Sequence, residues 1–131
     1  MLKICEYCGK PIDYDHAFCD ENCEHNTFLY YKQRRKWQSL FSALNIIGII
    51  TSMLGLLAGL MGHSLKLGLL ITGIGVMIIG ILYLLFPYYG IDDQIKKKGI
   101  ITTKRTVKML GIIALLVGLI CIVSSIIISF L

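Results

Sequence analysis

Two close pairs of cysteines open the chain, Cys5-x2-Cys8 and Cys19-x3-Cys23. Paired thiolates are the usual ligands of a structural Zn²⁺ ion, which takes four of them in a tetrahedron. Gly9 follows the first pair and can adopt the positive φ that a tight turn needs. Cys19 and Cys23 would share one face if both lie on a helix. We therefore predict one zinc ion held by Cys5, Cys8, Cys19 and Cys23.

A site closed by four sulfur atoms has no open coordination position, so the predicted metal is structural and not catalytic. The loop between the pairs is too short to bury a core, and metal binding is expected to supply much of the folding energy of this segment. Three alternatives remain open: iron in the same cage, four thiols without metal, or replacement of one cysteine by His16 or His25.

The remainder of the chain is too apolar for a soluble domain of 131 residues, with 56% hydrophobic and 16% charged residues. Three uncharged runs are each long enough to cross a bilayer as a helix. We predict a mainly α membrane fold, in which a small zinc ribbon precedes a three-helix transmembrane bundle. The expected segments are a zinc module (1–26), a juxtamembrane helix (27–39), three spans (40–62, 67–86 and 109–131) and a basic loop (87–108).

Lysines and arginines predict the orientation, because basic residues near span ends stay on the cytoplasmic side. Of the 13 basic residues, only Lys66 falls between the first two spans; the others precede the first span or lie in the 87–108 loop. We expect a multi-pass protein of the cell membrane, with a cytoplasmic N-terminus and loop and an external C-terminus. The reducing cytoplasm then disfavours disulfides between the paired cysteines.

The motif Cys5-x2-Cys8-Gly9-Lys10-Pro11-Ile12, followed by Phe18-Cys19-x3-Cys23, resembles the treble-clef-like zinc ribbons at the N-termini of small archaeal membrane proteins. The resemblance covers about the first 36 residues and implies zinc binding by the four cysteines. It brings no established activity. Asp20 stands where related fingers often have serine, and it can still cap a helix.

The charge of the predicted zinc module argues against nucleic acid as its partner. Residues 1–25 carry a formal charge of −4, and four thiolates around Zn²⁺ add −2. Such a surface repels phosphate, and a basic cytoplasmic protein surface is the better match.

A basic and aromatic cluster follows the zinc module, beside the first span. Such residues are typical of the interface with anionic lipid headgroups, and RNA or ribosome binding is the alternative. The cluster consists of Lys32, Arg34, Arg35, Lys36 and Trp37. The helix that carries Cys23 is expected to continue into the first span.

The 87–108 loop contains six of the 13 basic residues. Ile91, Ile95 and Val107 could lie on the bilayer surface while the lysines meet headgroups, although Gly99 interrupts any single amphipathic helix. A basic loop below an acidic module also predicts contact between the two.

Small residues recur every seven positions in all three spans, which places them on one face of each helix. We predict helix packing through these residues, either within the bundle or against other integral membrane subunits. They are Gly48, Gly55 and Gly62, with Gly59 on a similar face, then Gly73 and Gly80, then Gly111, Gly118 and Ser125.

The chain lacks a nucleophile beside a base, a paired carboxylate site with a pocket, and an open metal position, so we do not expect an enzyme. The favoured hypothesis is a noncatalytic accessory, assembly or regulatory subunit of a larger membrane complex. A membrane tether for ribosomes or RNA, and a redox sensor that releases zinc from thiolates, are the alternatives.

Overall fold

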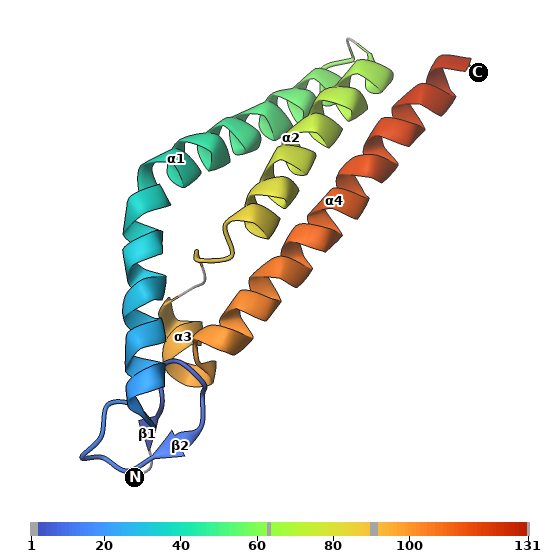
Figure 1. Cartoon of the computed structure of the whole chain (residues 1–131). Helices are drawn as coiled ribbons and strands as arrows, with labels where there is room; N and C mark the ends of the chain where they lie inside the picture. The colour runs from blue at the N-terminus through green and yellow to red at the C-terminus, as the bar shows by residue number, and fades with distance from the viewer. Residues whose placement is uncertain (1–2, 63, 90–91, 131) are drawn as a thin grey trace. The chain divides into compact units, whose positions relative to one another are not determined.

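The computed structural model describes residues 3–62, 64–89 and 92–130. Within these ranges the chain forms one small antiparallel sheet and four helices (Figure 1). The elements are β1 (Lys3–Ile4), β2 (Pro11–Ile12), α1 (Glu21–Leu60), α2 (Leu65–Leu85), α3 (Asp92–Lys98) and α4 (Ile100–Phe130). They divide into a head unit, residues 1–38 and 86–108, and a membrane unit, residues 39–85 and 109–131.

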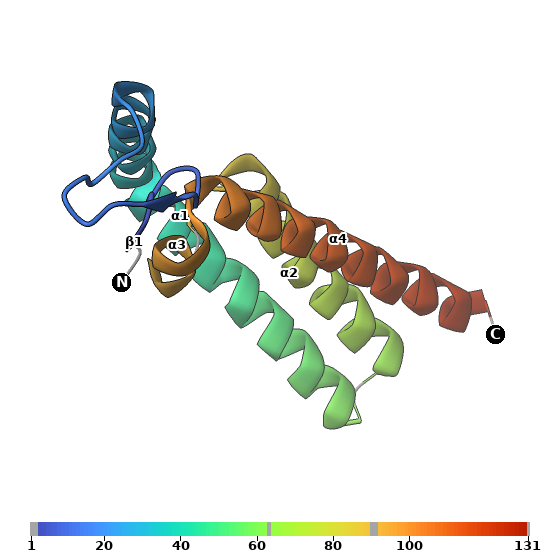
Figure 2. The same cartoon turned by 90° about the horizontal axis from the view of Figure 1, so that it is seen from below.

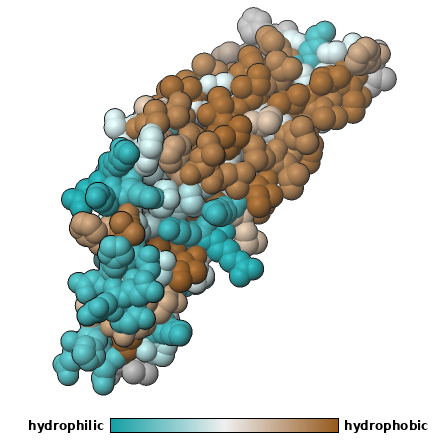
Figure 3. All heavy atoms as spheres, viewed as in Figure 1, coloured by the Kyte–Doolittle hydropathy of each residue, from teal (hydrophilic) through white to brown (hydrophobic). Residues whose placement is uncertain are grey.

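Among the described residues, three helices are long and apolar enough to cross a membrane by length and composition, which confirms the predicted fold class. On the face seen in Figure 3, the surface of the membrane unit is mostly apolar, and the polar surface belongs mainly to the head unit. As expected, the helix that carries Cys23 continues without a break into the first span. The 87–108 segment is mostly helical, because it contains α3 and the first two turns of α4.

In the membrane unit, α1 and α2 touch through their backbones. A Cβ atom on Gly75 would lie only 2.8 Å from the carbonyl oxygen of Gly48, and one on Gly68 would lie 2.8 Å from that of Gly55. Side chains of ordinary size would hold the helices apart. Gly68 and Gly75 are themselves seven residues apart and form a packing row that the sequence analysis missed.

Helix α2 lies between α1 and α4 (Figure 2). Its contact with α4 is made through the predicted glycine row on each helix. A Cβ on Gly73 would lie 2.9 Å from the carbonyl oxygen of Gly118, and one on Gly80 would lie 3.0 Å from that of Gly111. Ser125 continues the α4 row and donates a hydrogen bond of 2.7 Å to the carbonyl oxygen of Lys66. The small residues of α2 therefore serve two neighbours within the same chain.

The prediction for Gly62 is wrong. Helix α1 ends at Leu60, and Gly62 adopts a φ of +77° in the following turn. A Cβ at this position would meet no atom of the described residues within 4 Å. The seven-residue spacing runs past the end of the helix, where glycine is needed for its backbone conformation and not for packing.

The core of the head unit consists of Tyr30, Ile95 and Ile100, with the partly buried Tyr7 and Tyr88 packed against it. Ile95 is only 1% exposed, and Val107 is also buried. The expectation that both could lie on the bilayer surface is therefore wrong, because both side chains are buried within the head unit. Ile91 lies outside the described residues.

Candidate metal centre

The first cysteine pair lies in the turn that joins β1 to β2. The strands pair antiparallel, with Lys3 opposite Ile12. The N–H of Cys5 donates to the carbonyl of Lys10 at 2.8 Å, and the N–H of Gly9 donates to the carbonyl of Cys5 at 2.9 Å. Gly9 has a φ of +76°, as predicted from its place after the pair. These bonds make a tight knuckle, residues 5–9, that brackets the metal position with two thiols.

The second pair lies at the start of α1. The Asp20 carboxylate accepts a hydrogen bond of 2.6 Å from the N–H of Cys23 and so caps the helix that begins at Glu21. This bond lowers the pKa of Asp20. Cys19 precedes the cap and lies outside the helix, so the two cysteines do not share a helix face. The cap bends the chain between them and brings both thiols to the knuckle.

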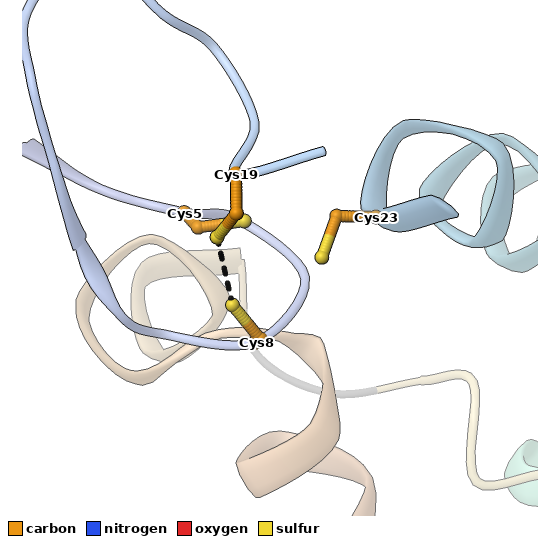
Figure 4. A group of neighbouring side chains, drawn as sticks. All are labelled: Cys5, Cys8, Cys19 and Cys23. Atoms are coloured by element: carbon orange, nitrogen blue, oxygen red, sulfur yellow. Dashed lines mark hydrogen bonds between the residues drawn. The ribbon is translucent and has the colours of Figure 1, made fainter. Parts of the chain in front are cut away.

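All four thiols converge on one point (Figure 4). Their Sγ atoms lie within 4.8 Å of one another, and those of Cys8 and Cys19 are 3.1 Å apart. A tetrahedral ion with metal–sulfur bonds of about 2.3 Å places its sulfur ligands about 3.8 Å apart. The cluster needs only small side-chain adjustments to reach this spacing, so its size and donor set fit a zinc ion.

The electrostatics of the thiols also favour a cation. Burial acts to raise the pKa of Cys5, but hydrogen bonds from backbone N–H groups in the knuckle and at Cys19 outweigh it and lower the pKa to about 6. At Cys19 the hydrogen bond with the Cys8 thiol raises the pKa to about 12. Four sulfur atoms this close cannot all ionise by themselves, because each thiolate opposes the next. A bound divalent cation offsets this repulsion between the thiolates.

A knuckle at a hairpin tip, facing a helix N-terminus that carries Cys23 and is directly preceded by Cys19, is the arrangement of a treble clef. Residues 3–57 match the DUF2116 family model, described as "Probable treble clef". The match confirms the resemblance to treble-clef fingers seen in the cysteine motif, and it extends beyond the motif into the first apolar run. No curated protein and no solved structure matches the chain. The treble clef and the three apolar helices fit a metal-binding membrane protein, and zinc is the usual metal of such a cage.

The basic and aromatic cluster lies on α1, in the part that belongs to the head unit. Lys36 places its Nζ 5.3 Å from the centre of the Trp37 ring, and the Trp37 and Phe86 ring centres are 5.5 Å apart. Arg34 forms a salt bridge of 2.6 Å with Asp92 of α3. Lys32, Arg35 and Lys36 are exposed, and their contact with lipid headgroups stays a prediction.

The predicted contact between the acidic module and the basic loop exists, but its chemistry differs from the expectation. The Arg34–Asp92 salt bridge is not part of this contact, because Arg34 lies outside the acidic module (1–26), in the juxtamembrane part of α1. The knuckle meets the loop through backbone groups of Glu6 and Tyr7, which bond to the start of α4. Sequence reasoning missed this role because carbonyl groups carry no side-chain signature. The isolated Gly99 after three lysines was the available signal.

Proposed function

We propose that this protein is a noncatalytic accessory, assembly or regulatory subunit of a larger membrane complex, with a structural zinc ion in its treble clef. The observation that carries the proposal is the convergence of four thiols within 4.8 Å. Four sulfur ligands fill the tetrahedral shell of zinc and leave no position for a substrate. The ion then organises a protein surface and performs no reaction.

The proposed site of action is the cell membrane, with the head unit in the cytoplasm. Six basic residues precede the first span and six follow the second, and an odd number of spans puts the two ends of the chain on opposite sides. A membrane-impermeant maleimide tests this orientation in intact cells. We expect it to label a Ser64→Cys variant and to label a Lys97→Cys variant only after permeabilisation. The opposite pattern would reverse the orientation.

The partner surface that we propose lies at the start of α1. An open groove of about 720 Å³ is lined there by Glu21, Asn22, Glu24, His25 and Phe28. Phe28 is 57% exposed, and two acidic side chains stand beside it. An apolar anchor with neighbouring acids suits a basic protein surface, because burial of the ring provides affinity and the charges provide selectivity.

Affinity purification from native membranes in a mild detergent, with chemical crosslinking, tests this function. We expect the full chain to recover a membrane protein that carries a basic cytoplasmic surface. A Phe28→Ala variant should lose that protein. A Tyr14→Ala variant should keep it, since Tyr14 is similarly exposed but does not line the groove. A chain that purifies as a monomer without any other protein would contradict the proposal.

RNA or ribosome tethering is the second candidate, because Lys32, Arg35 and Lys36 are exposed. Its signature in the same preparation is crosslinked RNA that disappears in an Arg35→Glu variant. That variant leaves the Phe28 groove intact and should not affect a protein partner that docks there.

A further inference from the structure

The knuckle of the metal site also caps helix α4. The N–H of Ile100 donates to the carbonyl oxygen of Glu6 at 2.8 Å, and the N–H of Ile101 donates to that of Tyr7 at 3.1 Å. These N–H groups belong to the first turn of α4, where a helix cannot supply its own acceptors. The backbone carbonyls of the knuckle therefore accept the hydrogen bonds that a capping side chain accepts at other helix N-termini.

Two glycines allow this close approach. Gly99 has a φ of +82° and separates α3 from α4, and its carbonyl accepts the backbone N–H of Thr103 at 3.2 Å. A Cβ on Gly99 would lie 2.6 Å from the backbone nitrogen of Gly9. Any larger residue would push the knuckle and the start of α4 apart. We call this contact, formed by Glu6, Tyr7 and Gly9 against 99–101, the knuckle seam.

Apolar packing reinforces the seam. Tyr7 packs against the core in which Ile95 and Ile100 are almost completely buried. Ile95 comes from α3 and Ile100 from α4. Tyr7 of the knuckle therefore packs against a core to which both helices contribute. The short α3, with only seven residues, has little stability of its own and depends on this packing.

The residues of the seam lie between and beside metal ligands. Glu6 and Tyr7 are the two residues between Cys5 and Cys8, and Gly9 directly follows Cys8. Their backbone positions are held by the same turn that presents the thiols. A knuckle of this length has no core of its own, so its geometry depends on the bound ion.

We propose that metal binding at the four cysteines docks α3 and the first turn of α4 onto the knuckle, and that metal loss releases them. The seam thus links metal occupancy to the segment that presents the exposed Lys96, Lys97 and Lys98. This coupling requires the metal site, but it does not depend on a partner complex. It holds or fails independently of the proposed subunit role.

Hydrogen–deuterium exchange of the full chain in detergent, with zinc bound and after chelation, tests the coupling. We expect exchange of residues 95–103 to become roughly tenfold faster or more when zinc is removed, because the seam hydrogen bonds and their packing are lost. Exchange in the middle of the spans should stay unchanged. If residues 95–103 keep their protection in the metal-free chain, the proposal is overturned.

A Gly99→Ala variant tests the coupling in the reverse direction, by perturbing the seam and measuring zinc binding. Coupling between two sites is reciprocal, so a variant that opens the seam must also weaken zinc binding, by roughly 5- to 150-fold for typical coupling energies. The matched control is Gly62→Ala, because Gly62 has a similar φ of +77° but no atom within 4 Å of the added Cβ. Equal zinc affinity and equal exchange of residues 95–103 in both variants would refute the coupling.

Discussion

The hydroxyl of Tyr30 donates a hydrogen bond of 2.6 Å to the backbone carbonyl oxygen of Tyr88. Tyr30 lies on α1 and is only 2% exposed, whereas Tyr88 belongs to the segment that follows α2. Lys104 of α4 places its Nζ 5.1 Å from the centre of the Tyr30 ring and 5.0 Å from that of Tyr88. Three parts of the chain thus meet at this pair of tyrosines, inside the head unit.

Replacing Tyr30 by phenylalanine should destabilise the head by about 1 kcal/mol, because the ring packing stays while the Tyr88 carbonyl loses a donor. Denaturant titration followed by fluorescence of Trp37, the single tryptophan of the chain, measures the change. Trp37 is a suitable reporter since it contacts Phe86 within the head. Tyr14→Phe is the control, because Tyr14 is 63% exposed and should leave the midpoint unaltered. Equal midpoints for both variants would exclude a role for the Tyr30 hydroxyl in stability.

Serine in place of any of the four clustered cysteines should reduce the zinc content from one ion per chain to a fraction, and a double replacement should abolish binding. Cys121→Ser should retain the full content, because Cys121 lies apart on α4. Zinc affinity should also fall as the pH is lowered, since the thiols must lose protons to bind the metal. Elemental analysis of the purified chain measures the content. Full zinc content in the double variant would refute the site.

Alanine at Asp20 should weaken zinc binding roughly tenfold, because the carboxylate that fixes the Cys23 backbone is removed. Asparagine should cost much less, since its side-chain oxygen still accepts the Cys23 N–H. Competition with a chromophoric chelator measures both affinities. Asp15→Ala removes an equal charge from an exposed position and serves as the control. If it weakens binding as much as Asp20→Ala, charge and not capping is responsible.

Alanine at Gly75 should destabilise the membrane unit by about 1–3 kcal/mol, because its Cβ would lie 2.6 Å from the backbone nitrogen of Ser52. The matched variant is Gly59→Ala, whose Cβ would meet only the Cα of Gly68, at 3.8 Å. It should be neutral or slightly stabilising, since alanine favours helix over glycine. Unfolding in mixed micelles by sodium dodecyl sulfate compares the two. A greater loss for Gly59→Ala would contradict the backbone contact seen at Gly75.

The sequence alone predicted the three membrane-length helices and the four cysteines that cluster, because both depend on local chemistry. Uncharged runs of about 20 residues have few options other than a membrane helix, and close cysteine pairs near each other in the chain can meet around one ion. The seven-residue glycine rows followed from the same kind of local periodicity, and most of them pack as predicted. Gly62 shows the limit, since spacing alone cannot tell where a helix ends.

The tertiary structure decided which surfaces those elements bury. The sequence could not reveal that α2 packs through two glycine rows. Which helix each row contacts depends on where the neighbouring helices lie. The sequence also could not assign Ile95 to the head core or place the carbonyls of Glu6 and Tyr7 at the start of α4. Apolar side chains pack equally well against protein or lipid, and every residue carries a backbone carbonyl. Only contacts between distant segments distinguish these outcomes.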